Sequence, residues 1–318
     1  MLSYCDLFCG CGGFSLGFKQ NGYRHLGALD VDLMAWETYR ANISNKVLNQ
    51  DITEMYSLEF RDYLGERPDI VLAAPPCEGF TEANEKRKKN AYERLYTEPG
   101  SLTIKAIDWI CDLNPRIGFI IENVPAIMDH PIKGYLIDEF SRIGYDEVYF
   151  NIIRAELLGS ASKRPRMFIS NMKFDESEIE LGNEYYSVLD AIGNLPDPTD
   201  VHDVPDHVVN IVTKSKKQGA IHLLKWSDSV VRYKGASGTK KNWIRIHPYK
   251  KSPIVMGKST LVHPYEDRQL TIREYARLQG FPDDFIFHGN FYDKRNQIGE
   301  AVSPVVSDFL ARKILEHH

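Results

Sequence analysis

A cysteine in a rigid loop is the residue of this chain whose surroundings best suit nucleophilic chemistry. Cys77 follows two prolines and precedes Glu78 and Gly79, directly after the apolar stretch 69–74. Proline fixes the backbone, and a thiolate is a strong nucleophile once its proton has been removed. A cysteine without such a context is usually a small buried apolar residue, and this alternative stays open for Cys77 alone.

A carboxylate follows another apolar stretch in the same manner. Glu122 comes directly after residues 117–121, within the sequence Glu-Asn-Val. If both stretches are neighbouring parallel strands, their carboxyl ends lie at one edge of the sheet, and Glu122 lies near Cys77. Loss of solvent there would raise the pKa of Glu122 and make it a proton donor, whereas an acid at the protein surface would only end the strand.

A glycine-rich turn near the N-terminus has the composition of a ligand-binding turn. Residues 6–13 read Asp-Leu-Phe-Cys-Gly-Cys-Gly-Gly and follow the first apolar run, where a doubly wound sheet binds its ligand. Asp30 ends the next apolar run and is suited to accept hydrogen bonds from a ribose. A tight turn without a ligand is the alternative. No Gly-Lys-Ser or Gly-Lys-Thr follows, which excludes a phosphate-binding loop of that type.

The elements that position these residues alternate between strand and helix. Apolar runs predict strands over 2–8, 24–29, 69–74 and 117–121, and helical spacing predicts helices over 14–20, after Asp32, and over 102–113. This alternation predicts an α/β fold with a parallel, doubly wound, Rossmann-like sheet. After about residue 172 the pattern becomes irregular, with strand-like pieces at 222–224 and 230–233 and helices at 271–279 and 307–315. A second, smaller unit is expected there.

Composition excludes several other classes of protein. The 318 residues are 43% hydrophobic and 26% charged, which is typical of a globular chain. No apolar run approaches the roughly 20 residues of a membrane helix, and the N-terminus does not resemble a signal peptide, so we expect a cytoplasmic protein without membrane contact. The five cysteines are expected to be thiols, and their spacing predicts no metal site.

Positive charge is concentrated in one part of the chain although the net charge is −5. Between residues 211 and 262 there are twelve Lys and Arg and one Asp, so this segment carries +11 and the rest carries −16. A basic segment of this kind is typical of a surface that contacts nucleic acid phosphates. Within it we expect phosphate contacts from Lys240, Lys241, Lys250 and Lys251, and base contacts from side chains such as Arg232, Asn242 or Arg245.

Six motifs in order give the chain a family resemblance. They are DLFCGCGG at 6–13, PPCEGFT at 75–81, ENV at 122–124, KRPRMFI at 163–169, RQLTIREYARLQGFPDDF at 268–285 and QIGEAVSP at 297–304. In these motifs the sequence resembles the DNA (cytosine-5)-methyltransferases of the prokaryotic restriction-modification type. The resemblance spans nearly the whole chain.

The resemblance implies a large catalytic domain that binds S-adenosylmethionine and a small target-recognition domain. The large domain would span 1–180 and be completed by 297–318, and the small domain would span 181–296. Double-stranded DNA would lie between them with the target cytosine flipped out. The enzyme would act as a monomer, alone or beside a restriction endonuclease that cuts the same site without binding the methyltransferase.

The resemblance also implies roles for individual residues. Cys77 would add to carbon 6 of cytosine, Glu122 would hold the ring nitrogen and exocyclic amine, and Arg164 and Arg166 would bind the base carbonyl and adjacent phosphate. The implied cofactor residues are Phe8 for adenine stacking, Gly10, Cys11 and Gly13 for the methionine part, Asp30 for the ribose, Val31 for the adenine face, Asp51 and Ile52 for the adenine edge, and the backbone of Glu300 and Ala301.

Three residues differ from the common family pattern. Glu78 replaces the usual Gln after the cysteine, Ser162 stands where the basic motif often begins with Gln, and Glu300 replaces a common Asn. The charged run 82–98 matches the family's mobile loop that closes over DNA. Two other functions stay open: a tRNA methyltransferase, although no cysteine follows Cys111 as that branch requires, and a catalytically silent DNA-binding paralogue.

Overall fold

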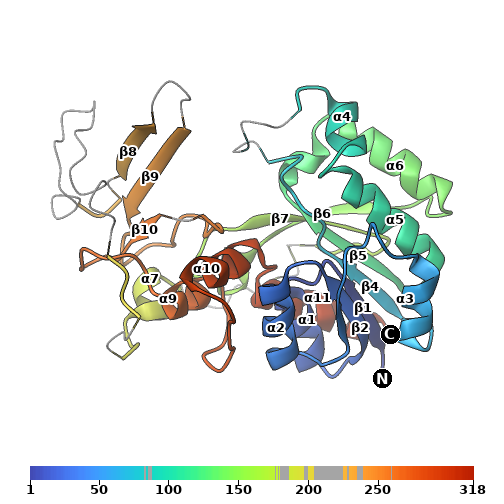
Figure 1. Cartoon of the computed structure of the whole chain (residues 1–318), viewed down its shortest axis with the longest axis horizontal. Coiled ribbons are helices and arrows are strands. Elements are labelled where there is room, and N and C mark those ends of the chain that lie inside the picture. Colours follow the sequence, from blue (N-terminus) through green and yellow to red (C-terminus); the bar gives the residue numbers. More distant parts are fainter. Residues whose placement is uncertain are drawn as a thin grey trace.

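A seven-stranded sheet and a separate three-stranded sheet organise the chain (Figure 1). The computed structural model describes residues 1–81, 84, 88–175, 177, 179, 186–196, 200–203, 225–227, 229–234, 239–258 and 260–318. The strands are β1 Ser3–Leu7, β2 Arg24–Asp30, β3 Val47–Asn49, β4 Ile70–Ala73, β5 Gly118–Asn123, β6 Tyr149–Arg154, β7 Pro165–Ser170, β8 Ser229–Lys234, β9 Thr239–Arg245 and β10 Leu261–Val262. The helices are α1 Gly13–Gln20, α2 Leu33–Asn42, α3 Ser57–Leu64, α4 Ala91–Tyr96, α5 Ser101–Leu113, α6 Ile132–Arg142, α7 Val188–Ile192, α9 Ile272–Leu278, α10 Phe291–Glu300 and α11 Pro304–His317, with 3-10 helices η1 Pro125–Met128 and η2 Ala155–Leu158.

The large sheet has the order β3-β2-β1-β4-β5-β7-β6. Its first five strands are parallel, which confirms the predicted α/β sheet. The sequence did not predict the two strands at the other edge, where β7 is antiparallel to both β5 and β6. Only η2 and a short loop join β6 to β7, and so short a connection cannot cross over to make a parallel pair.

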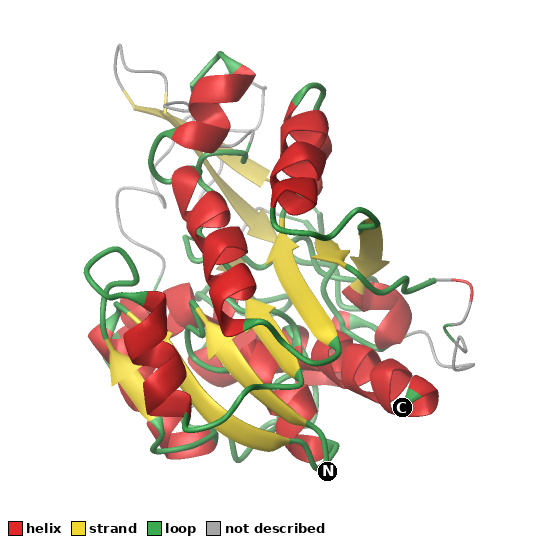
Figure 2. Cartoon of the chain, turned by 90° about the vertical axis from the view of Figure 1, so that its right-hand side faces the viewer, coloured by secondary structure: helices red, strands yellow, loops and turns green. Residues whose placement is uncertain are grey.

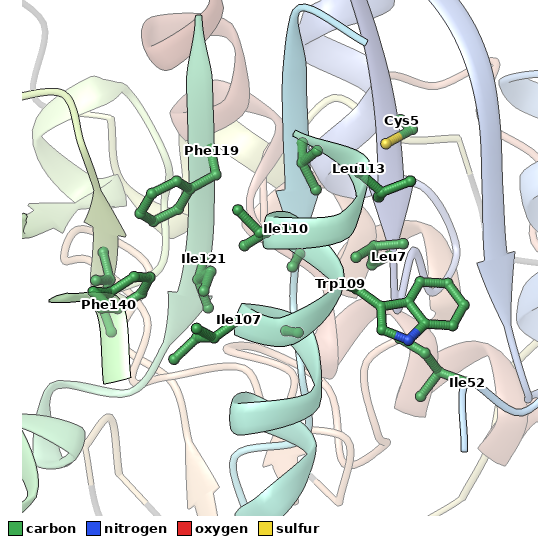
Figure 3. Packing of buried hydrophobic residues seen from close by; sticks show 14 of the residues in the cluster. Cys5, Leu7, Ile52, Ile107, Trp109, Ile110, Leu113, Phe119, Ile121 and Phe140 are labelled. Carbon is green, nitrogen blue, oxygen red and sulfur yellow. The ribbon is translucent and has the colours of Figure 1, made fainter. Parts of the chain in front are cut away.

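Helix α5 covers one face of this sheet with a continuous apolar stripe. Ile107, Ile110 and Leu113 recur at helical spacing and are fully buried. Figure 3 shows Ile107 and Ile110 beside Phe119 and Ile121 of β5, and Leu113 beside Cys5 of β1, in a cluster that also receives Trp109. Burial of one shared apolar surface therefore holds α5 against β5. Figure 2 shows helices packed against the sheet.

The opposite face of the sheet is covered by α1 and α11, which come from distant parts of the sequence. Gly17 lies at their crossing, and a β-carbon there would stand 2.2 Å from the backbone nitrogen of Asp308. The Tyr23 hydroxyl donates to the carbonyl of Ala311 over 2.8 Å. Helices therefore cover both faces, as in a doubly wound fold, and α11 completes the layer that α1 begins.

The three-stranded sheet, β10-β9-β8, lies with α7, α9 and α10 to the left of the large sheet in Figure 1. The expected strand at 230–233 is part of β8, whereas 222–224 lies outside the described residues. The predicted helix at 271–279 begins with a capping box, because Thr271 accepts from the Glu274 amide and Glu274 accepts from the Thr271 amide. No helix in the described ranges is long and apolar enough to cross a membrane.

Candidate active site

Cys77 lies in the loop that leaves the carboxyl end of β4, as the sequence predicted. The thiol is partly accessible, and its sulfur is 3.4 Å from the hydroxyl oxygen of Thr81. The Thr81 hydroxyl also lies 3.0 Å from the Cys77 carbonyl, and the Thr81 amide donates to that carbonyl over 2.9 Å. This local turn holds the sulfur in place. All five cysteines are free thiols.

Glu122 and Arg166 face each other from the antiparallel strands β5 and β7. Arg166 Nε lies 3.0 Å from Glu122 Oε1, and both side chains are largely buried. The next residue, Asn123, donates from its side chain to the carbonyl of Pro75 over 3.3 Å. This bond ties the Glu-Asn-Val segment to the loop that carries Cys77, so the two motifs are held together.

The buried carboxyl of Glu122 influences the protonation of the Cys77 thiol. Burial raises the pKa of Glu122, and the positive charges of Arg166 and Arg164 lower it. Burial likewise raises the pKa of the Cys77 thiol, while the Thr81 hydrogen bond and Arg166 lower it and Glu122 raises it. A raised pKa at Glu122 agrees with its predicted role as a proton donor. Arg166 is the cation that lowers the pKa of both Glu122 and Cys77.

Arg164 occupies a different environment from Arg166. Its side chain is fully buried, and its two terminal nitrogens donate to the carbonyls of Val255, Gly299 and Ala301 over 2.8 to 2.9 Å. These contacts join the residue before β7 to the end of α10 and to the segment between β9 and β10. Arg164 therefore positions backbone around the site, and its donors are directed at the protein and away from the surface.

The glycine-rich turn contains positive φ angles, which residues other than glycine rarely adopt. Phe8 and Gly10 have φ values of 57° and 51°. A β-carbon at Gly10 would meet nothing within 4 Å, so the space beside this turn is open. The Asp30 carboxylate accepts from the amides of Gly10 and Asp32 over 2.7 and 2.8 Å. The turn and the acid are thereby fixed together.

The far side of the turn packs against the segment that follows α10. A β-carbon at Gly13 would stand 2.3 Å from the Val302 carbonyl oxygen and 3.1 Å from the Ala301 β-carbon, so only glycine fits. The buried Cys11 sulfur is 3.7 Å from the Gln297 carbonyl oxygen. Residues nearly 290 positions apart thus form one wall of the site.

The remaining expected cofactor residues lie at the ends of β2 and β3. Val31 is 66% exposed, which is unusual for an apolar residue at the end of a buried strand. The Asp51 carboxylate accepts from the amide and hydroxyl of Thr53, and Ile52 is buried behind it. Open space at Gly10, exposed Val31 and the fixed Asp30 together fit a nucleoside ligand.

The three departures from the family pattern occupy different environments. Ser162 is buried, donates to the Pro253 carbonyl over 3.1 Å and pairs with Ser252, so its role is structural. Glu78 is exposed directly after Cys77, and Glu300 is exposed at the end of α10.

Two basic residues of the +11 segment are internal. Arg245, expected among the base contacts, is buried and donates to the carbonyls of His263 and Glu266 over 2.8 Å, so that expectation was wrong. Lys251 Nζ donates to the Ser160 carbonyl over 2.7 Å, whereas the Lys250 side chain is exposed. Arg232, Lys240, Lys241 and Asn242, for which contacts to DNA were predicted, lie in β8 and β9, and the structure describes only their backbone.

Sequence reasoning assigned no role to Thr81 or Asn123. Both lie inside the motifs at 75–81 and 122–124. Their closeness in sequence to Cys77 and Glu122 was the signal that could have indicated a supporting role. Their contacts depend on the turn after Cys77 and on the pairing of β4 with β5, which place these side chains. No cluster of metal-ligating side chains occurs in the part of the chain that the structure describes.

Comparison with known proteins identifies the family. The model of the family described as C-5 cytosine-specific DNA methylase matches residues 2–316. The chain belongs to this family. M.MJ0563P of Methanocaldococcus jannaschii is 39% identical to this methyltransferase, over 98% of this chain and 99% of that protein. The type II methyltransferase M1.HphI of Haemophilus parahaemolyticus is 31% identical, over 99% of this chain and 87% of its own.

Solved structures show the same fold as this methyltransferase. A protein described as a DNA modification methyltransferase from an Escherichia coli prophage has a TM-score of 0.74 and 21% identity, with 99% of each chain covered. The Schizosaccharomyces pombe Dnmt2 methyltransferase has a TM-score of 0.68 and 17% identity, with both chains covered completely. Together with the family match, the type II relatives identify a DNA (cytosine-5)-methyltransferase of the restriction-modification type.

Proposed function

We propose that this enzyme methylates carbon 5 of a flipped-out cytosine in a short site of double-stranded DNA, through a covalent adduct of Cys77. The observation that carries the proposal is the arrangement of the Cys77 thiol, the buried Glu122 carboxyl and Arg166 at neighbouring strand ends. A pyrimidine ring resists addition unless a nucleophile and a proton donor act on it together. These side chains supply both.

The proposed steps follow from the state of each group. The Cys77 thiolate forms a bond to carbon 6, while Glu122 donates a proton to the ring nitrogen, which leaves carbon 5 electron-rich. Arg166 holds Glu122 in place and contacts the base carbonyl. After carbon 5 is methylated, a solvent water takes its proton, the electrons of that C–H bond re-form the double bond, and the thiolate of Cys77 is expelled. The ring nitrogen returns its proton to Glu122, so the enzyme regains its starting state. The positive charge of Arg166 favours the thiolate before and after the reaction.

S-adenosylmethionine is the proposed cofactor, and it supplies the methyl group. Phe8, Val31 and Ile52 would contact the adenine, Asp51 its edge, and Asp30 the ribose. The turn at Gly10, Cys11 and Gly13 and the backbone of Glu300 and Ala301 would surround the methionine part. The open space beside Gly10 and the two amides that orient Asp30 support this assignment.

Two domains are proposed on the same basis. Residues 1–180 with 297–318 would form the catalytic domain, and residues 181–296 would recognise the DNA sequence. The packing of α11 on α1 supports the return of the final segment to the catalytic domain. We propose that the enzyme acts as a monomer and that any endonuclease of the same specificity acts on the DNA separately. Arg164 is proposed as a positioning residue, because its donors hold the backbone of that final segment.

A mechanism-based substrate tests the function. With duplex DNA containing 5-fluorocytosine and S-adenosylmethionine, the enzyme should form a complex that survives denaturing electrophoresis, because fluorine cannot leave carbon 5 as a proton does. The Cys77→Ser variant should form none. A complex that persists in this variant would contradict the assignment, and methylation of a tRNA in preference to the duplex would establish the alternative substrate.

A further inference from the structure

Three segments that are distant in the chain meet at one end of the three-stranded sheet. Strand β8 is antiparallel to β9, and β10 is parallel to β9. The start of β8 therefore lies beside the ends of β9 and β10. The Ser227 amide donates to the Arg245 carbonyl over 2.8 Å, which joins the residues before β8 to the end of β9.

Each of these segments contributes an aromatic side chain that is exposed to solvent. Trp226 is 41% exposed, Tyr249 58% and Tyr265 54%. The centroid of the Trp226 ring lies 5.8 Å from that of Tyr249 and 5.9 Å from that of Tyr265, with both pairs of rings nearly perpendicular. The His247 ring lies 5.1 Å from Trp226. Single exposed apolar side chains are ordinary, whereas a cluster of exposed aromatic rings indicates a binding surface.

The aromatic cluster borders a hollow of about 620 Å³. Its apolar lining comes from Trp226, His247, Pro264 and Tyr265. Sites for small organic ligands have volumes of about 300 to 1,000 Å³. A hollow of this size with aromatic walls suits a flat aromatic ligand.

Hydrogen bonds hold the walls of the hollow in place. The Trp226 indole nitrogen donates to the Pro264 carbonyl over 3.1 Å. The Arg245 guanidinium donates to two carbonyls of the loop 263–267 over 2.8 Å each. These bonds fix the loop that carries Tyr265 against the end of β9. A ligand would therefore bind at a small cost in ordering the protein.

The charges around the hollow favour a nucleotide over a cationic ligand. Lys225 and Arg245 line the hollow, and Lys250, next to Tyr249 in the sequence, is exposed. Asp267 is the one acid among the described lining residues, and it pairs with Arg245. These positive charges repel a quaternary ammonium group, which aromatic cages otherwise bind. A nucleotide instead offers a base to the rings and a phosphate to Lys225.

We propose that this hollow holds an unpaired base of the DNA, stacked against Trp226 and Tyr265. The assignment to DNA rests on the proposed function, in which a cytosine leaves the duplex for the site at Cys77. Its departure breaks a base pair and the stacking on both sides, so that other bases lose their partners. The aromatic walls replace part of the lost stacking, and Lys225 contacts the adjacent phosphate. The hollow is a second nucleobase site, formed by other segments than the one that receives the target cytosine.

Binding of two labelled tetranucleotides to the full chain tests this proposal. One is tetrathymidylate, and the other has the same sugars and phosphates without bases. Wild type should bind tetrathymidylate about fivefold to hundredfold more tightly, the range for stacking of one base on an aromatic side chain. Trp226→Ala should abolish this preference and leave the affinity for the abasic tetramer unchanged, whereas Trp226→Phe should keep most of the preference.

Two further variants control for the fold and for exposed aromatic rings in general. Tyr265→Ala removes a largely exposed ring from the hollow and should also reduce the preference. Tyr56→Ala removes an exposed ring that precedes α3 and should leave the preference unchanged. The Trp226 and Tyr265 variants should still form the covalent adduct with saturating 5-fluorocytosine DNA, which shows that they are folded.

The outcomes separate this inference from the proposed function. Equal affinity of wild type for both tetramers would overturn the inference, and so would a preference that persists in both Trp226→Ala and Tyr265→Ala. Tighter binding of tetrauridylate RNA than of tetrathymidylate would overturn the assignment to DNA. If wild type prefers tetrathymidylate through Trp226 but forms no adduct with 5-fluorocytosine DNA, the proposed function fails while the nucleobase site stands.

Discussion

Replacement of Asp6 by Asn should change how the stability of the enzyme depends on pH. Asp6 is fully buried in β1, directly before the glycine-rich turn, and its Oδ2 accepts from the Ser15 hydroxyl over 2.6 Å. Its other oxygen has no hydrogen-bond partner among the described residues. Burial raises the pKa of Asp6 to about 7, the Ser15 bond lowers it, and the charge of Asp30 raises it.

The expected magnitude follows from the difference between folded and unfolded states. An aspartate in an unfolded chain has a pKa of about 3.9, so the folded value is higher by about three units, equivalent to about 4 kcal/mol. Protonated Asp6 stabilises the fold. This contribution is complete below about pH 4 and is lost as the pH rises through about 7. Relaxation of the site would reduce the loss, so 4 kcal/mol is about the upper limit.

Urea unfolding of wild type and Asp6→Asn between about pH 4.5 and about pH 8.5 measures the effect. The variant cannot ionise at this position, so its unfolding free energy should rise relative to wild type by about 2 to 4 kcal/mol across this range. Asp62→Asn, on the exposed side of α3, is the control and should give a constant difference. A constant difference for Asp6→Asn as well would show that the buried carboxyl does not titrate in this range.

Three further predictions concern the site and its supports. Arg166→Gln should raise the pH at which Cys77 reacts with iodoacetamide, because Arg166 lowers the pKa of that thiol; an unchanged alkylation profile would contradict this. Arg164→Met should lower the free energy of unfolding in urea by about 3 to 5 kcal/mol, since three buried carbonyls lose their donor. A decrease below about 1 kcal/mol would show that Arg164 does not hold these backbone segments together. Lys250→Ala should flatten the plot of log affinity for DNA against log salt concentration by about 0.9 in slope. Lys251→Ala should mainly lower the free energy of unfolding, because Lys251 Nζ binds the Ser160 carbonyl. Equal slopes for both variants would exclude Lys250 from phosphate contact.

Much of the catalytic side of the molecule could be predicted from local sequence. Cys77 and Glu122 each follow an apolar strand, and the parallel arrangement of such strands brings their ends together without further information. The position of Asp30 at the end of β2 was predicted from the same pattern. The antiparallel β6 and β7 could not be predicted in this way, because pairing direction depends on where the chain passes between strands.

The environments of charged side chains were the least predictable part. Arg164 directly precedes β7 and Arg166 lies within it, yet one is buried against backbone carbonyls and the other pairs with Glu122. Arg245 has the composition of a DNA contact, but it is enclosed by the loop at residues 263–267. Sequence gives the type of each residue, whereas the packing of distant segments decides which charges face solvent.

The pairing of α1 with α11 has a consequence for synthesis of the enzyme on the ribosome. The hydroxyl of Ser307 donates to the carbonyl of Phe14 across 293 residues of chain. At about 5 to 20 residues per second, α1 waits some 15 to 60 seconds before the helix that covers it is made. During this interval the apolar face around Phe14 and Phe18 is available to chaperones. The nascent chain cannot complete this helical layer until α11 has left the ribosome, so DNA modification begins only after the segments between the two helices have also been made.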